Sequence, residues 1–114
     1  IVSPAGIGVE ANRQALLDGT RHLNPVTVFA VPDQALPVGE VREALTGEDV
    51  PRTHKLAMIA AGEALAGADR PPDAIVLGCT TGGMATTEEL LKNNVKDPAA
   101  FRFHGTGSVA EWLA

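Results

Sequence analysis

The spacing of apolar and polar residues predicts two helices in the first two thirds of the chain. In residues 9–18 small groups of apolar and polar side chains alternate, and Gly19 follows where a helix can end in the left-handed conformation. Residues 54–66 are apolar almost all round, with only a thin polar stripe through Lys55 and Glu63. A helix of that kind is buried on most faces, so we expect the second helix to lie between layers of structure.

Two shorter stretches have the composition of extended chain. Residues 73–78 contain a continuous apolar run and lead into the turn at residues 79–83, which predicts a buried parallel strand. Residues 26–31 are also β-prone, but Pro25 and Pro32 bracket them. An edge strand and an extended loop are both compatible with that second pattern.

Two capping-box patterns predict helices in the last third of the chain. Thr86 and Glu89 have the spacing S/T-x-x-E and would start a helix that runs to about Asn93, and Ser108 and Glu111 repeat the spacing for a last helix. The resulting order of helix, strand, helix, strand and helix favours a layered α/β architecture.

Composition narrows the class of protein. A chain of 114 residues has room for one domain at most, and a net charge of −5 with scattered basic residues disfavours nucleic acid as a partner. No apolar stretch approaches the roughly 20 residues of a membrane helix, so we expect no membrane span. The single Cys79 excludes an internal disulfide, which fits a cytoplasmic location.

Cys79 is the first candidate for chemistry, because it ends the apolar run and precedes a glycine-rich turn. A nucleophilic cysteine also needs a base, and His54 and His104 are candidates by residue type alone. We favour a structural interpretation, in which Cys79 is a small buried apolar side chain. His22 and the other histidines share no metal-ligand spacing with Cys79, so neither a metal nor a cofactor is expected.

The glycine turn at residues 79–83 admits two further interpretations. Such turns before helices can bind phosphate through their amides, but this turn lacks the lysine of a P-loop and the spacing G-x-G-x-x-G. The structural alternative is that Gly82 and Gly83 allow a backbone path that a Cβ atom would close.

Four segments in this order resemble the β-ketoacyl synthase family of the thiolase-like superfamily. They are Ile1-Val2-Ser3-Pro4-Ala5-Gly6, the stretch from Pro51 through Gly62-Glu63-Ala64-Leu65, Ile75-Val76-Leu77-Gly78-Cys79-Thr80-Thr81-Gly82-Gly83, and His104-Gly105-Thr106-Gly107-Ser108-Val109-Ala110-Glu111. They are similar to the family's opening strand, its alanine-rich helix, its G-x-x-x-G-G turn and the helix leading toward its active-site strand. The likeness leaves out residues 20–50.

The resemblance implies that residues 1–114 are the N-terminal part of a synthase domain, truncated at both ends. The expected fold is part of the first half of a layered αβαβα thiolase-like structure. The intact enzyme would be a cytoplasmic 3-oxoacyl-[acyl-carrier-protein] synthase in fatty acid or polyketide synthesis. It would condense acyl and malonyl thioesters with loss of CO₂, with acyl carrier protein as partner, and it would form a homodimer.

The resemblance also bears on the site residues. The family's catalytic Cys-His-His triad would lie beyond the end of this chain, so we expect no catalytic residue in it and no activity from it alone. The glycine turn runs near the acyl pocket in these synthases, which makes Thr81 and Met84 candidates for lining a substrate pocket. A catalytically silent chain-length subunit of the same fold and an unrelated small α/β binding domain stay open as alternatives.

Overall fold

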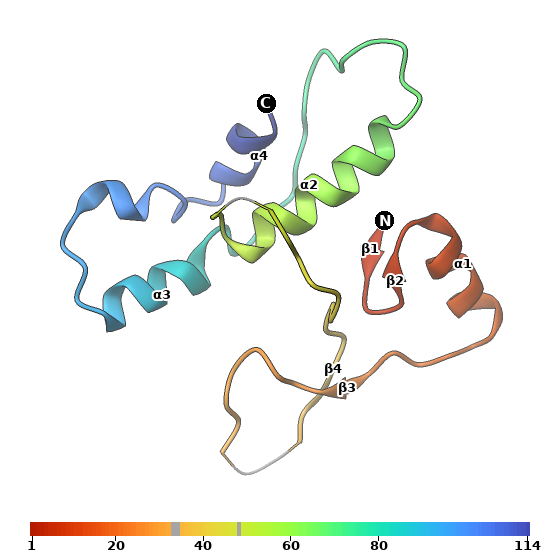
Figure 1. The fold of residues 1–114 in the computed structure, drawn as a ribbon, viewed down its shortest axis with the longest axis horizontal. Helices are drawn as coiled ribbons and strands as arrows, with labels where there is room; N and C mark the ends of the chain where they lie inside the picture. The colour runs from red at the N-terminus through yellow and green to blue at the C-terminus, as the bar shows by residue number, and fades with distance from the viewer. Residues whose placement is uncertain (33–34, 48) are drawn as a thin grey trace. The chain divides into compact units, whose positions relative to one another are not determined.

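The computed structural model describes residues 1–32, 35–47 and 49–114, and these form a small mixed α/β structure (Figure 1). The chain divides into two compact units, Ile1–Ala44 and Leu45–Ala114. Within the described ranges, the elements of the first unit are β1 (Val2–Ser3), β2 (Gly6–Ile7), α1 (Val9–Leu17), β3 (Asn24–Pro25) and β4 (Pro37–Val38). Those of the second unit are α2 (Arg52–Leu65), α3 (Met84–Lys92), the 3₁₀ helix η1 (Pro98–Phe101) and α4 (Ser108–Leu113).

The first unit begins with a hairpin that packs on α1. β1 and β2 pair antiparallel, and the Asn12 side chain on α1 donates to the carbonyl oxygens of Gly6 at 3.1 Å and Gly8 at 2.7 Å. The helix predicted for residues 9–18 is therefore confirmed. It ends as expected, because Gly19 takes a φ of +62° and its N–H donates to the Leu16 carbonyl.

The β-prone residues 26–31 form a loop rather than a strand. β3 and β4 pair antiparallel over two residues each, and the last link is the N–H of Val26, which donates to the Leu36 carbonyl at 3.0 Å. Thr27 then turns to the Glu40 carboxylate, to which its own N–H and hydroxyl both donate. Of the two interpretations that the flanking prolines left open, the extended loop is the one observed.

The second unit is built around α2, which packs on α4 (Figure 1). The predicted helix at residues 54–66 is confirmed and begins slightly earlier, with Pro51 as its N-cap. The expected burial is wrong for this chain. Of the residues of α2 only His54 is fully buried, whereas Met58 and Leu65 are each 45% exposed. The helix is covered by the short α4 and by nearby loop residues, which leaves much of its apolar surface open.

The parallel strand predicted at residues 73–78 does not form. The run is outside every described strand, and its backbone from Ala74 to Gly78 takes part in no hydrogen bond with the described residues. Val76 is 98% exposed, whereas Ile75 and Leu77 are each 39% exposed. A strand needs a neighbour to pair with, and the described part of this unit offers none.

α3 starts earlier than the capping-box pattern predicts. Gly83 is its N-cap and makes no side-chain bond, so Thr86 and Glu89 lie inside the helix rather than at its start. The first turn is instead fixed by the preceding glycine turn, since the N–H of Thr87 donates to the Gly83 carbonyl. The predicted end at about Asn93 is confirmed.

The second capping box, at α4, is also wrong. Gly107 is the N-cap, and Ser108 lies in the first position of the helix. Its hydroxyl donates backwards to the Gly105 carbonyl at 2.6 Å and to the Phe103 carbonyl at 3.1 Å. Because Ser108 lies inside the helix rather than before it, its hydroxyl is not at the N-cap position from which it could accept the amides of the first turn.

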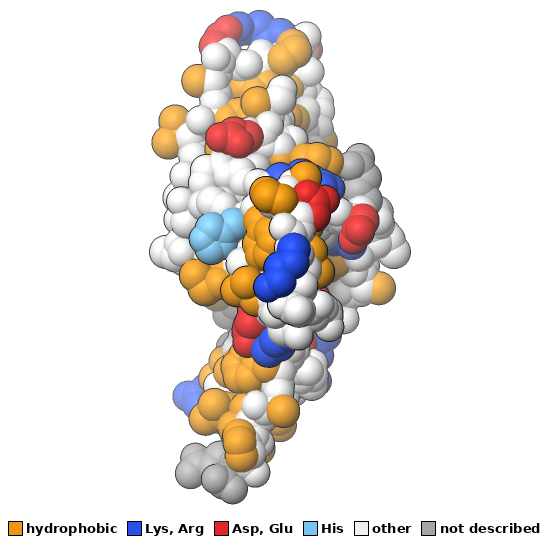
Figure 2. All heavy atoms as spheres, turned by 90° about the vertical axis from the view of Figure 1, so that its left-hand side faces the viewer, with side chains coloured by type: hydrophobic (Ala, Val, Ile, Leu, Met, Phe, Trp, Pro, Cys, Tyr) orange, Lys and Arg blue, Asp and Glu red, His pale blue; other side chains and the backbone are white. Residues whose placement is uncertain are grey.

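The hydrophobic core of the described chain is small. Val109 is its fully buried apolar residue, and apolar side chains are open to solvent at the surface (Figure 2). None of the described helices is long and apolar enough to cross a lipid bilayer.

Candidate functional site

The glycine turn packs backbone to backbone against residues 103–105. The Gly83 N–H donates to the Phe103 carbonyl at 2.8 Å, and a Cβ built on Gly83 would lie 2.4 Å from that oxygen. Gly82 has a φ of +50°, and its Cβ would lie 2.6 Å from the Gly105 carbonyl oxygen. The structural interpretation of the two glycines is confirmed, because side chains would close this path.

Three amides at the glycines and the start of α3 are already used within the protein, which argues against the phosphate interpretation. The Gly82 N–H donates to the Cys79 Sγ at 3.2 Å, the Gly83 N–H to Phe103, and the Met84 N–H to the Thr81 carbonyl at 3.0 Å. A phosphate site of this type needs amides that point at the ligand. These three point into the protein.

Cys79 takes part in the turn through a hydrogen bond. Its half-buried thiol accepts the Gly82 N–H, and the two histidines proposed by type are bonded to other side chains. His54 bonds to Ser108, and His104 Nδ1 lies 3.2 Å from the Thr87 hydroxyl. Nor do the described residues contain a group of three His, Cys, Asp or Glu side chains that could hold a metal.

Thr81 lies within the glycine turn, and Met84 is the first residue of α3. Thr81 is exposed, and Met84 is 54% exposed. Neither lines one of the hollows described below, so their role in a substrate pocket stays a prediction.

A buried cluster around His54 joins α2 to α4. The imidazole is fully buried, and its ring meets the Phe103 ring edge to face at 4.8 Å between centroids. Phe103 in turn meets Trp112 edge to face at 5.6 Å, and the Arg102 guanidinium lies 4.5 Å from the centre of the Phe103 ring. Edge-to-face and cation–π contacts of this kind stabilise a packed arrangement beyond the area they bury.

The pairing of His54 with Ser108 is not that of a catalytic dyad. The two side chains lie 3.1 Å apart, from Nε2 to Oγ. The serine hydroxyl has one proton and directs it to the carbonyls of Gly105 and Phe103, so it must accept from the imidazole. Nε2 therefore carries the proton and cannot act as a base toward this serine. Nδ1 is left buried without a hydrogen-bond partner among the described residues.

The His54 pair predicts a pH dependence of stability. Burial lowers the pKa of the imidazole, and an interaction with the Ser108 backbone offsets part of this effect. Below the ordinary histidine pKa of about 6.5 the unfolded chain takes up a proton that the folded chain refuses. Stability should thus fall as pH drops from about 6.5 to the lowered pKa, by at most about 1.4 kcal/mol per pH unit.

Thermal unfolding followed by circular dichroism between pH 7.5 and 5.5 measures this dependence. The variant His54→Gln keeps an amide donor for Ser108 but cannot titrate, so its slope over the same range should be smaller. Equal slopes in the two proteins would contradict the assignment.

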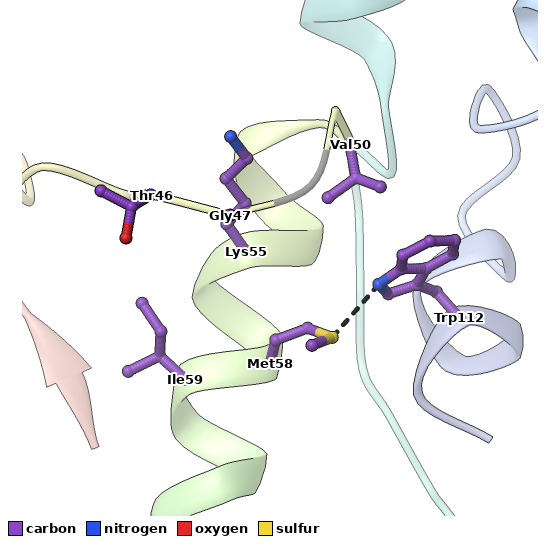
Figure 3. A pocket seen from close by; sticks show the side chains of 7 residues that line it. All are labelled: Thr46, Gly47, Val50, Lys55, Met58, Ile59 and Trp112. Atoms are coloured by element: carbon purple, nitrogen blue, oxygen red, sulfur yellow. Dashed lines mark hydrogen bonds between the residues drawn. The ribbon is translucent and has the colours of Figure 1, made fainter.

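Two hollows in the second unit could hold a ligand. One, of about 340 Å³, is lined by Thr46, Gly47, Val50, Lys55, Met58, Ile59 and Trp112 (Figure 3). The other, of about 750 Å³, lies along the second half of α2, where Ala61 and Leu65 face the apolar residues Ile75 and Leu113. Both are mostly apolar.

Sequence reasoning missed the His54 cluster and both hollows. The residues concerned are far apart in the chain, since His54 and Ser108 are separated by 54 positions, as are Met58 and Trp112. No spacing rule connects such positions. The one available signal was residue type, because a lone tryptophan and a histidine on an apolar helix are both unusual.

We compared the chain with protein families, curated proteins and solved structures. No family model, no curated protein and no solved structure matches this chain.

Proposed function

We propose that this chain is the N-terminal part of a 3-oxoacyl-[acyl-carrier-protein] synthase. One observation supports the proposal most. The glycine turn at residues 79–83 and the stretch at residues 104–111 that leads into α4 are two of the four segments similar to the synthase family. Their backbones are in direct contact, because a Cβ on Gly82 would lie 2.6 Å from the Gly105 carbonyl oxygen. The residues that carry the resemblance are thus coupled in space as well as ordered in the sequence.

A second observation is compatible with the proposal. The apolar residues 74–78 lie extended with unused backbone groups, and Ile75 borders the apolar hollow beside α2 and α4. An extended run that rests on helices and lacks a paired neighbour suits a layered α/β fold that further strands complete. In the proposed parent those strands would belong to the rest of the synthase domain.

The proposed reaction belongs to the parent enzyme. A cysteine thiolate attacks the acyl thioester of the carrier protein, and the carrier thiol leaves. Loss of CO₂ from a malonyl thioester then gives a carbanion that attacks the enzyme-bound acyl group and releases the cysteine. Histidines or backbone amides stabilise the negative charge that develops on oxygen. The present chain would supply scaffold and, through Thr81 and Met84, part of a pocket wall.

The first test is activity. Residues 1–114 are expected to form no 3-oxoacyl product from acyl-carrier and malonyl-carrier thioesters, because the family's Cys-His-His triad would lie outside them and Cys79 is hydrogen-bonded within the glycine turn. Product is measured by mass spectrometry of the carrier protein. Formation of product above background, and its loss in Cys79→Ala, would revive the nucleophile and refute this assignment.

The second test uses the gene. Within about 20 codons after Ala114 the proposal expects a cysteine at the start of the next helix, and the whole gene product should condense the two thioesters. Glutamine or another residue at that position, with an inactive product, would favour the silent chain-length subunit. A stop codon directly after Ala114 would favour the unrelated binding domain.

A further inference from the structure

The hollow between α2 and the loop before it has the form of a small-molecule site. Its volume of about 340 Å³ lies within the range of about 300–1,000 Å³ that is usual for such sites. Val50, Met58, Ile59 and Trp112 give it apolar walls, and Figure 3 shows Met58 turned toward Trp112 with Ile59 next to it on α2.

The charged side chain that lines the hollow is a cation. Lys55 is the charged residue among its described lining residues, and none of them carries a carboxylate. The Lys55 ammonium makes a long hydrogen bond of 3.4 Å to the Leu45 carbonyl, which is neutral, and it forms no ion pair with the residues that the structure describes. An ammonium has three N–H donors, so others are available to a ligand.

The far side of the hollow can adapt to an apolar group. The indole Nε1 of Trp112 donates to the Met58 thioether at 3.1 Å (Figure 3). Sulfur is a weak acceptor, and methionine is a flexible side chain that fills irregular gaps. Met58 is also 45% exposed, so it can move without opening a core.

We propose that this hollow binds a small amphipathic carboxylate, with its carboxyl group on Lys55 and its apolar body between Met58, Ile59 and Trp112. The apolar walls call for an aliphatic or aromatic body. A single lysine matches the one charge of a carboxylate better than a phosphate, which usually takes an arginine fork or several donors. The proposal uses neither Thr81 nor Met84 and stands apart from the synthase assignment.

The protein contains its own reporter for this site. Trp112 is the single tryptophan of a chain without tyrosine, and it lines the hollow. Octanoate is the probe, and octanol is its uncharged counterpart. Titration with octanoate should change the Trp112 emission in a saturable way, and octanol should bind about tenfold more weakly, because it lacks the charge-assisted bond.

The matched variants separate the charge from the fold. Lys55→Met keeps the aliphatic stem and should lower octanoate affinity about tenfold while leaving octanol unchanged. Lys55→Arg keeps the charge and should retain binding. Lys92→Met makes the same chemical change on α3, where Lys92 pairs with Glu88 at 2.7 Å, and should leave octanoate affinity unchanged.

Three results would overturn the proposal. They are an octanoate titration without a saturable change in Trp112 emission, equal affinity for octanoate and octanol in the unmodified protein, and equal loss of octanoate affinity in Lys55→Met and Lys92→Met. The second comparison needs no variant, so it decides the question even if Lys55→Met fails to fold.

Discussion

Gly83→Ala is expected to destabilise the second unit by about 2–4 kcal/mol, since it combines overpacking with a weakened hydrogen bond. The new Cβ would lie 2.4 Å from the Phe103 carbonyl oxygen, which also accepts the Gly83 N–H. The φ of Gly83 is −96°, which alanine also adopts, so the cost comes from the close contact and not from backbone strain. Because the obstacle is backbone, no side-chain rotation can relieve it, and the turn must separate from residues 103–105.

Gly62→Ala is the matched control. Gly62 lies within α2, and a Cβ there would meet nothing within 4 Å. The same substitution should therefore stabilise the chain by about 0.5–1 kcal/mol, as glycine-to-alanine changes in helices do. Chemical denaturation followed by circular dichroism at 222 nm compares the two variants. If Gly83→Ala matched the unmodified protein, the close contact between the two segments would be wrong.

The reliable sequence signals in this chain are local. The helix at residues 9–18 and the one at residues 54–66 form where the apolar period places them, and Gly19 and Asn93 mark helix ends as expected. In each case the deciding interactions lie within about five residues of one another. Such interactions are present in any fragment that contains them.

The failures occur where the surrounding structure, distant or close in the sequence, does not supply what the pattern requires. Residues 73–78 have the composition of a buried strand, but a strand requires a neighbour that the described part of the second unit does not supply. The capping box at Thr86 does not form because α3 already begins after Gly83. The one at Ser108 does not form because α4 begins after Gly107 and the serine hydroxyl donates to the Gly105 carbonyl. A pattern in sequence states what a segment could do, and the surrounding structure decides whether it does so.

Part of the candidate site could likewise be predicted from the sequence, and part could not. The role of Gly82 and Gly83 followed from the absence of a side chain and is confirmed. The position of Lys55 beside Trp112 could not be predicted, because it depends on how α4 packs on α2. Lys55 had been noted only as part of a polar stripe on that helix.

Association is the last and largest expected effect. Val109 is the fully buried apolar residue of the described chain, whereas Val76 is 98% exposed and Leu16 83% exposed. Folding stability is a small difference between burial and chain entropy, of about 5–15 kcal/mol for an ordinary domain. A core this small cannot offset that entropy with a wide margin. Large apolar side chains left open to solvent in such number favour an interaction with a partner surface.

We therefore expect the purified chain to be marginally stable and to gain stability by associating, with itself or with the rest of a larger fold. Its melting temperature should rise with protein concentration, because association that favours the folded state shifts unfolding by mass action. Light scattering coupled to size-exclusion chromatography gives the mass, and thermal unfolding across a hundredfold dilution series gives the linkage. Val76→Asp places a charge at the most exposed apolar position of the unpaired run and should weaken association without disturbing the fold. Thr20→Asp, at an exposed polar position of the first unit, is the control for surface charge alone. A monomer whose melting temperature ignores dilution would show that the small core suffices and that the open apolar run needs no partner.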